Sequence, residues 1–418
     1  MEEGQILQDM TFLMENYQND YYNMEDMKGL LYDAVNEILE MAVSHGFEGD
    51  LWHNYLTYLM ASHENAYSTS CEIVGPVDGS INQVALHDFE IFKELFDYDF
   101  ADLENVMGVD CISMLHDYVG TSGHGSVFNQ RIRDRICDLS KALAETETAV
   151  EFKDIMTQFY KEFGVGKLGL HKAFRIAHTE EGALIEPITK IAHVHLDDLV
   201  GYEIAKKKLI DNTKAFVEGK KANNCLLFGD AGTGKSSSIK AILNQYYDQG
   251  LRMIEVYKHQ FKDLNDVIAQ IKNRNYKFII SMDDLSFEEF EIEYKYLKAV
   301  IEGGLEKKPD NVLIYATSNR RHLIRETFKD KEDRDEELHT NDTVQEKLSL
   351  VARFGVTIYF GKPDKKQFQE IVRELAKKNG IDMPDDELLL EANKWELSHG
   401  GLSGRTAQQF IDYLAGTR

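Results

Sequence analysis

The sequence predicts a three-layer α/β domain with a small all-α lid after it and a mostly α-helical domain before it. Two observations predict this fold class. From about residue 190, short apolar runs rich in β-branched residues alternate with helical periodicity, which is typical of repeated β-α units around a parallel sheet. Inside this region, one glycine-rich segment matches a phosphate-binding loop in full. We therefore expect an acidic helical domain at residues 1–163, a junction at 164–190, an α/β nucleotide-binding domain at 191–362 and a helical lid at 363–418.

Length and composition exclude several classes of protein. The 418 residues are too many for one compact core and suit two or three domains. No window approaches 18 uncharged apolar residues, and residues 1–4 are acidic where a secretory signal needs basic residues. The four cysteines lie far apart, which disfavours a disulfide framework or a zinc site. These features predict a cytoplasmic protein without a membrane segment.

The net charge of −25 is concentrated at the start of the chain. Residues 1–130 contain 24 Asp or Glu but only Lys28 and Lys93, a net charge of −22. Such a surface repels phosphate backbones, so the charge does not support a nucleic-acid partner. Two interpretations of the acidic region stay open: it attracts a basic partner, or it serves only solubility.

Residues 1–163 show helical periodicity that is interrupted by turn signals. Apolar residues between 27 and 42 recur every three or four positions, which predicts one helix that ends near Gly46. A second helix is expected around residues 89–96, and the glycine–proline cluster at 75–79 marks a turn. Three glycines at 164–169 disfavour both helix and strand interiors, so we expect a junction there.

The α/β domain is expected to contain five strands joined by helices. Apolar residues at helical spacing over 239–246 and 264–271 indicate two of these helices. After Pro363 only helical patterns follow, which predicts the all-α lid. The expected strands are 225–228, 253–256, 278–282, 312–317 and 356–360.

The strongest motif is a phosphate-binding loop of the form G-x-x-x-x-G-K-[ST]. It follows the apolar run 225–228 and opens a helix, which is the order that the chemistry needs. Glycines let successive backbone N–H groups turn toward a phosphate, and the helix N-terminus adds partial positive charge. Lys235 is expected to reach the β- and γ-phosphates of ATP, and the Ser236 hydroxyl to ligate Mg²⁺. The residues expected to bind nucleotide here are Gly229, Asp230, Ala231, Gly232, Thr233, Gly234, Lys235, Ser236 and the adjacent Ser237.

Two carboxylates follow the expected strand at 278–282. This strand should end at the sheet edge where ligands bind in such folds. We expect Asp283 to hold Mg²⁺, and Asp284 to orient and polarise the attacking water. Asp284 is one methylene shorter than the glutamate that most ATPases of this kind carry, so hydrolysis could be slow, or Glu288 or Glu289 could assist. Asp284 could instead only cap the next helix.

These motifs together resemble the AAA+ ATPase superfamily. Residues 165–415 look like a narrower bacterial family of AAA+ ATP-binding proteins, known as domain of unknown function 815. The resemblance implies the fold of an α/β P-loop NTPase (AAA+) with a small all-α lid. Asp283-Asp284 in place of Asp-Glu departs from the superfamily but is typical of the narrower family. The matching stretches are 196–203, 229–236, 283–287, 315–323 and 403–405.

The resemblance also implies roles for residues outside the loop. Val200 and Gly201 correspond to the segment that packs on the adenine ring. Asn319 corresponds to sensor 1, an amide that holds the lytic water in line. Arg405 corresponds to sensor 2, which touches the γ-phosphate from the lid. Arg353 corresponds to the arginine finger that reaches the neighbouring subunit's nucleotide.

Each of the two arginines has a rival interpretation. Arg353 could simply cover apolar surface at a helix end. Arg320 or Arg321 would then be the arginine that acts in trans. Arg405 could form an ordinary ion pair between the lid and the α/β domain.

We therefore expect a Mg²⁺-dependent ATPase that hydrolyses ATP to ADP and phosphate. An arginine that acts in trans implies a homo-oligomer, either a ring or an open spiral, and the protein client is unknown. Residues 257–261 carry aromatic side chains but no glycine, which weakens a polypeptide-threading role. One alternative is a low-turnover ATP-dependent switch or loader that recruits a protein partner. Another is a small-molecule kinase, in which Asn319, Arg353 and Arg405 would have no purpose.

Overall fold

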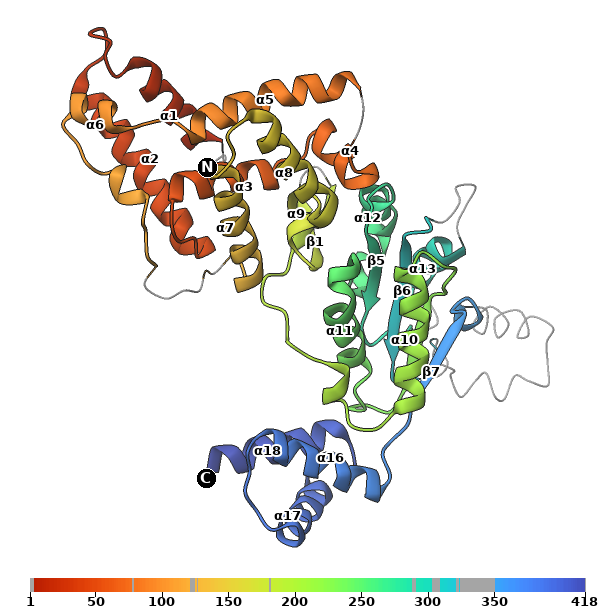
Figure 1. The fold of residues 1–418 in the computed structure, drawn as a ribbon. Coiled ribbons are helices and arrows are strands. Elements are labelled where there is room, and N and C mark those ends of the chain that lie inside the picture. Colours follow the sequence, from red (N-terminus) through yellow and green to blue (C-terminus); the bar gives the residue numbers. More distant parts are fainter. Residues whose placement is uncertain are drawn as a thin grey trace. The chain divides into compact units, whose positions relative to one another are not determined.

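The computed structural model describes residues 4–76, 79–120, 125, 127–179, 182–287, 291–302, 309–320, 323 and 350–417. The chain divides into two compact units (Figure 1). The first unit comprises Met1–His171 with Pro187–Lys190. The second unit comprises Lys172–Glu186 with Ile191–Arg418.

The described part of the first unit is built from helices around one apolar core. Helix α3 lies at its centre, because it packs against α2, α5 and α7 and nearly all of its residues are buried. Trp52 of α3 donates its indole N–H to the carbonyl of Leu95 at 2.9 Å, so this buried ring leaves no polar atom unpaired. The helices are α1 Gln5–Asn16, α2 Met24–His45, α3 Leu51–Ser62, α4 Ala66–Val74, α5 Ser80–Phe96, α6 Ala101–Met107, α7 Gln130–Ala144, α8 Ala149–Phe163 and α9 Gly166–Leu170.

Local sequence signals explain where these helices begin and end. The side chain of Asn23 accepts a hydrogen bond from the backbone N–H of Glu25 and so caps α2. Gly46 ends the same helix with a φ of 78°, a left-handed conformation that glycine adopts at low cost. The predictions of a helix that ends near Gly46 and of a second one around 89–96 are both confirmed, by α2 and α5. No helix within the described ranges is both long and apolar enough to cross a membrane.

The second unit contains a sheet whose described strands run in the order β2-β1-β4-β5-β6-β3-β7. Neighbours from β1 to β7 in this order pair in parallel. Strand β6 is buried along its whole length, as expected for a parallel sheet with both faces covered. The strands are β1 Ala173–Thr179, β2 Gly182–Pro187, β3 Cys225–Gly229, β4 Leu251–Glu255, β5 Lys277–Met282, β6 Val312–Ser318 and β7 Val356–Phe360.

All five strands expected from the sequence are present, as β3 to β7, and two further strands were missed. Strands β1 and β2 lie within 164–190, where we expected only a junction. The glycine argument holds only at Gly164, which ends α8, and it is wrong for 166–170, where the short helix α9 contains both Gly166 and Gly169. It does not reach β1, in which the buried Phe174, the exposed Arg175 and the buried Ile176 alternate as strand residues do.

Helices surround the sheet, and a separate small helical layer follows it (Figure 1). The helices beside the strands are α10 Glu203–Val217, α11 Lys235–Tyr246, α12 Leu264–Ile271 and α13 Glu293–Glu302. The layer after β7 consists of α16 Lys365–Lys378, α17 Asp385–Ser398 and α18 Gly404–Thr417. These three helices share an apolar core of their own around Phe368 and Phe410. The expected three-layer α/β fold with an all-α lid is therefore confirmed.

Candidate functional site

A cavity of about 650 Å³ lies where the carboxyl ends of the strands meet the lid of the second unit. Its floor is the segment between β3 and α11, residues 231–237. One wall comes from the end of β6 and from residues that follow β5 and β6, and the opposite wall comes from 198–200, Tyr202 and lid helices α16 and α18. Parallel strands bring all of their carboxyl ends to one edge, which is why loops far apart in the sequence meet here.

The loop between β3 and α11 depends on glycines at two places. Gly229 has a φ of 139°, and a Cβ at this position would stand 2.0 Å from the carbonyl oxygen of Phe360 in β7. Gly234 has a φ of 90° directly before the first turn of α11. A larger side chain would be strained at Gly234 and would clash at Gly229. The glycines therefore set the curve that points the loop and the N-terminus of α11 into the cavity.

Lys235 is held at the mouth of this loop. Its Nζ donates to the carbonyl oxygens of Gly229 (2.9 Å) and Asp230 (2.6 Å) and to Oδ1 of Asn319 (3.0 Å). The side chain is only 6% exposed. Burial is the main cause and lowers the pKa of the Lys235 ammonium from its ordinary value, while the carboxylates of Asp230, Asp284 and Asp283 partly oppose this shift. A partly desolvated cation with three oxygen neighbours is a strong attractor for an anion.

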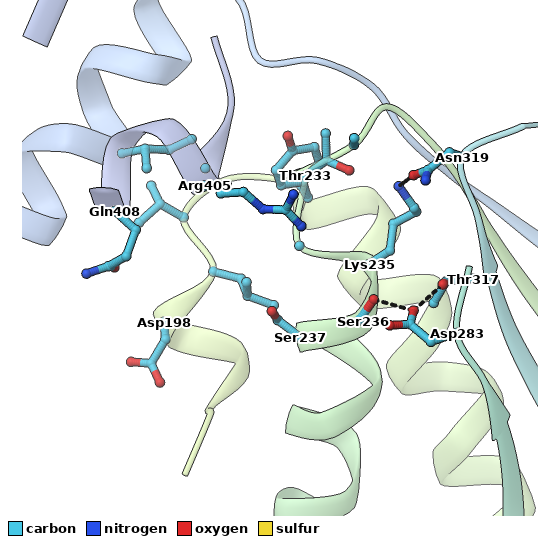
Figure 2. A pocket seen from close by; sticks show the side chains of 18 of the residues that line it. Asp198, Thr233, Lys235, Ser236, Ser237, Asp283, Thr317, Asn319, Arg405 and Gln408 are labelled. Carbon is cyan, nitrogen blue, oxygen red and sulfur yellow. Dashed lines mark hydrogen bonds between the residues drawn. The ribbon is translucent and has the colours of Figure 1, made fainter. Parts of the chain in front are cut away.

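Three elements converge on the carboxylate of Asp283. Figure 2 shows the hydroxyls of Ser236 and Thr317 both pointing to this carboxylate. Ser236 Oγ at the start of α11 donates to Asp283 Oδ1 at 2.5 Å, and Thr317 Oγ1 of β6 donates to the same oxygen. The backbone N–H of Asp284 in turn donates to Thr317 Oγ1 at 2.9 Å. The ends of β5, β6 and the start of α11 are thereby tied together.

Asp284 adopts an unusual backbone conformation. Its φ is 51°, and among the described non-glycine residues only Tyr202 shares a positive value. Aspartate tolerates this left-handed region better than most residues, because its short side chain can bond locally. Asn319 Nδ2 donates to Asp284 Oδ1 at 2.7 Å, while Asn319 Oδ1 accepts from Lys235. One amide thus orients both a carboxylate and an ammonium, as Figure 2 shows for its bond to Lys235.

The lid touches the loop directly. The backbone N–H of Arg405, at the start of α18, donates to the carbonyl of Gly232 at 3.2 Å. A Cβ on Gly232 would stand 3.1 Å from both Arg405 Cβ and Ser403 Oγ. The Arg405 side chain is exposed and lines the cavity. Any shift of the lid therefore moves a cation relative to the loop.

The other end of the cavity is apolar. Leu199 and Val200 face Ile371 and Leu375 of α16 across it. At the edge of this end, Lys378 Nζ of α16 donates to Asp198 Oδ1 at 2.8 Å. A flat aromatic ring would make apolar contacts at this end, and charged groups of the same ligand would make polar contacts at the loop.

The structure brings most of the predicted residues together. Val200, residues 231–237, Asp283, Asp284, Asn319 and Arg405 all line the cavity. Gly229 and Asp230 lie just behind the lining, where their carbonyls hold Lys235. Gly201 is not part of the lining.

Of the arginines proposed to act in trans, neither Arg353 nor Arg320 lines the cavity. Arg353 lies outside the lining, and its guanidinium forms an ion pair with Glu302 of α13. Arg320 follows β6 and is exposed. Arg321, like Glu288 and Glu289, lies outside the described residues.

Sequence reasoning missed several residues of the site. Thr317 is the residue that the sequence could most easily have revealed, because β5 and β6, the two strands that end at this point, were both predicted. Met282 pairs with Ala316 in parallel register, so the next residues, Asp283 and Thr317, stand side by side. Ile371 and Leu375 could not be found, because their spacing is that of any buried helix face. Gln408 of α18 also lines the cavity and carried no signal.

The donor set can be tested against a metal ion. No group of three or more His, Cys, Asp or Glu suited to a metal occurs in the described ranges. Ser236 and Asp283 offer a hydroxyl and a carboxylate oxygen side by side. Two oxygen ligands of this kind fit Mg²⁺, which keeps several waters and uses few protein ligands, and they do not fit zinc.

Similarity to known proteins is confined to part of the chain. A family model described as "Protein of unknown function (DUF815)" matches residues 169–418. No curated protein matches the chain. The Holliday junction branch migration motor RuvB of Thermotoga maritima is 16% identical with a TM-score of 0.37, over 52% of this chain and 63% of that chain. The FIGL-1 AAA domain in complex with ADP is 17% identical with a TM-score of 0.35, over 55% of this chain and 75% of that chain. The chain thus spans less than two thirds of the RuvB structure.

Proposed function

Because the chain belongs to the family described as protein of unknown function (DUF815), and because it has the α/β P-loop fold of AAA+ ATPases, we propose that it binds ATP with Mg²⁺ and hydrolyses it to ADP and phosphate. The observation that supports this most is the linked set of side chains at the strand ends. Lys235, Asn319 and Asp284 form one connected line, and Ser236, Asp283 and Thr317 form another. An ammonium, a candidate metal ligand pair and a candidate base thus lie in one cavity.

The proposed nucleotide contacts follow the two ends of the cavity. The backbone N–H groups of residues 229–237 and the Lys235 ammonium would hold the phosphates. Arg405 would contact the terminal phosphate from the lid. Val200 and its neighbour Leu199, which both line the cavity, would flank the base, with Gly201 following them in the chain. We assign recognition of the nucleotide to this α/β domain and lid, at 191–362 and 363–418.

Ser236 and Asp283 are the residues that would hold the Mg²⁺ ion. The ion would supply positive charge beside the phosphates, where negative charge develops during transfer. Thr317 donates to Asp283, so it fixes the orientation of the carboxylate through its hydroxyl.

Asp284 and Asn319 would act on the water. The Asp284 carboxylate would accept a proton from the attacking water, and Asn319 holds that carboxylate in place. Asn319 also bonds Lys235, so the base and the phosphate-binding cation keep a fixed relation. The short side chain of Asp284 limits its reach, and we expect slow turnover for this reason.

We also propose assembly into a homo-oligomer, a ring or an open spiral, in the cytoplasm. Arg353 would complete the site of a neighbouring subunit, with Arg320 or Arg321 as the alternatives. The client would be a protein rather than a nucleic acid, because residues 1–130 carry a net charge of −22.

The test is phosphate release per protomer at saturating Mg·ATP while the protein concentration is raised. We expect the specific activity to climb, because Arg353 completes the site between subunits. Lys235→Ala should show no release, and Arg353→Ala should lack the climb. A clear rate that stays flat with concentration would contradict the role of Arg353 in trans.

A second candidate is a low-turnover ATP-dependent switch or loader that recruits a protein partner. The short side chain of Asp284 favours it, because an aspartate whose backbone is held in the left-handed region reaches less far toward a water molecule than a glutamate would. ATP binding with no phosphate release above the Lys235→Ala background would contradict the hydrolase and support the switch.

A further inference from the structure

The first unit carries a groove of about 480 Å³ that has no part in the nucleotide site. It lies among α1, α3, α4 and α5. Most of its lining is apolar and includes Leu7, Leu59, Ile81, Val84, Ile91 and Phe92. Within the described residues that line it, there is no Lys or Arg, and the one carboxylate is Asp88.

Helix α5 has an apolar face that is wider than the packing inside its own domain uses. Ala85 and Phe89 are buried, Ile81 packs against the core, and all three also line the groove. Val84 and Ile91 lie on the same side of the helix, with Asp88 in the same row. Val84 is 65% exposed and Ile91 is 47% exposed. Apolar side chains gathered in an exposed groove mark a surface that another molecule covers.

Both tyrosine hydroxyls beside the groove already have partners. The hydroxyls of Tyr67 and Thr157 bond each other at 2.6 Å in the interior. The hydroxyl of Tyr160 donates to the carbonyl of Met60 at 2.9 Å. An occupant therefore does not need to bond these two tyrosines, and it contacts their rings and the aliphatic side chains through apolar groups.

The charge around the groove is negative. Asp88 lines the groove, and Glu90 and Glu94 are exposed elsewhere on α5. The lysine of this helix, Lys93, is buried and bonds Asp97 at 2.6 Å, so it does not offset them. Residues 1–130 contain only one other lysine and carry a net charge of −22. This field attracts a cation and repels a second copy of the same unit.

We propose that this groove binds an amphipathic helix of a partner protein, with apolar residues on one face and Lys or Arg on its flanks. Ile81 to Ile91 spans about 15 Å along α5, which is the length of three helical turns. A partner helix would place residues at i, i+3 or i+4, and i+7 into the groove, and its cations would lie near the α5 carboxylates. This inference stands on the first unit alone and does not depend on the proposed ATPase activity.

The test begins with a display library of 16-residue helical peptides selected on the full-length protein. The residues of one face and of its flanks are randomised. We expect the enriched peptides to combine Leu, Ile, Phe or Met on one face with Lys or Arg beside it. Enrichment of neutral or acidic peptides, or no enrichment at all, would overturn the proposal.

The best enriched peptide is then labelled with a fluorophore, and its affinity is measured by anisotropy. Val84→Glu and Ile91→Glu should each weaken binding at least 10-fold, because each places a charge in the apolar contact. Val43→Glu on α2 and Val106→Glu on α6 are the matched controls, since these valines are 66% and 45% exposed. They should change the affinity less than 2-fold. Equal loss in the controls, or none in the groove variants, would contradict this binding site.

The contribution of charge is measured separately. Asp88→Asn should weaken binding of the cationic peptide at low salt and make the affinity less dependent on salt. Light scattering of the peptide-free protein at rising concentration tests whether a second copy of the chain fills the groove instead of a partner helix. Self-association that Val84→Glu abolishes would show that a second copy fills the groove, against the proposal.

Discussion

Thr317 connects the carboxylate of Asp283 to the backbone N–H of Asp284 through a single hydroxyl. It donates to Asp283 and accepts from the backbone N–H of Asp284. A methyl group can do neither, so replacement by valine leaves a backbone donor unpaired and releases the orientation of Asp283. The orientation of the Asp283 carboxylate and the path of the chain at Asp284 therefore both depend on this one hydroxyl.

We predict that Thr317→Val lowers the free energy of unfolding by about 1–3 kcal/mol. We also predict that phosphate release falls by roughly 10-fold, because a barrier increase near 1.4 kcal/mol has that effect. Urea unfolding and a phosphate-release assay measure the two quantities. Thr213→Val is the matched control, since that buried hydroxyl bonds Tyr315 away from the cavity. It should lose stability and keep its release rate.

A substitution at Asp284 can remove the proposed base and still keep the unusual backbone conformation of this residue. Asparagine also tolerates the left-handed region and keeps an oxygen for Asn319, but it carries no charge. We predict that Asp284→Asn lowers phosphate release by roughly 100-fold, which is the usual scale of a lost general base. Binding of Mg·ADP should change by less than about 3-fold, because Asp284 is not assigned to the metal or to the phosphates.

Asp283→Asn gives the contrasting result, since it removes a proposed metal ligand. Its Mg²⁺ requirement and its affinity for Mg·ADP should both change. Unchanged phosphate release in Asp284→Asn would show that Asp284 only shapes the chain after β5.

At the scale of elements, one ion pair joins the lid to the segment before α10. Lys378 of α16 bonds Asp198, and this bond is the main reason that the pKa of the Asp198 carboxyl lies below its ordinary value of 3.8. A carboxyl with a lowered folded-state pKa stabilises the fold above its ordinary pKa. That contribution is lost as the pH falls through the lower folded-state value. Both side chains are more than a third exposed, so the pair contributes below about 1 kcal/mol.

We predict that Asp198→Asn lowers the unfolding temperature slightly at pH 7 and that the difference from the wild type disappears once the pH falls below the lowered folded-state pKa of Asp198. Its affinity for Mg·ADP should fall roughly 2- to 5-fold, because the lid loses a contact that holds it over the cavity. Asp385→Asn is the control, since Asp385 bonds Arg373 inside the lid. An equal loss of affinity in both variants would contradict a role for this contact in placing the lid.

The parts of the fold that the sequence predicted are those with strong local signals. Strands β3 to β7 were predictable because each is a short apolar run between helical stretches. The loop and the carboxylates after β5 were predictable because a motif fixes their spacing. Strands β1 and β2 were missed because neighbouring glycines suggested a junction, and only pairing with β4 defines β1 as part of the sheet.

The remaining site residues depend on contacts between distant segments. Ile371 and Leu375 belong to a helix whose period shows an apolar face but not what that face covers. The ion pair of Arg353 with Glu302 joins residues 51 positions apart, and no spacing rule links them. Such details follow from tertiary packing and could not be predicted from the local pattern.

At the scale of the whole molecule, the two units allow separate responses to ligand. The cavity is built entirely from residues of the second unit. A ligand that binds only the folded state stabilises the unit that holds it. The first unit should not gain from nucleotide, since its core has no share in the site.

We predict two calorimetric transitions, of which Mg·ADP raises only one. At a concentration 100 times its Kd, the ligand should add about 2.7 kcal/mol to the stability of the second unit. Lys235→Ala should remove this shift and leave the other transition where it was. If both transitions moved together with ligand, the two units would be unfolding as one.

The ion pair between Arg353 and Glu302 has a consequence for how an assembly could start. In a single chain the Arg353 guanidinium is already paired with the carboxylate of Glu302. To serve a neighbour it must exchange that carboxylate for another anion. Both side chains are partly solvent-exposed, and pairs of this kind are weak, so the exchange costs little. Glu302 would then hold the Arg353 side chain in an ordered position until the nucleotide of a neighbouring subunit competes with it for the guanidinium.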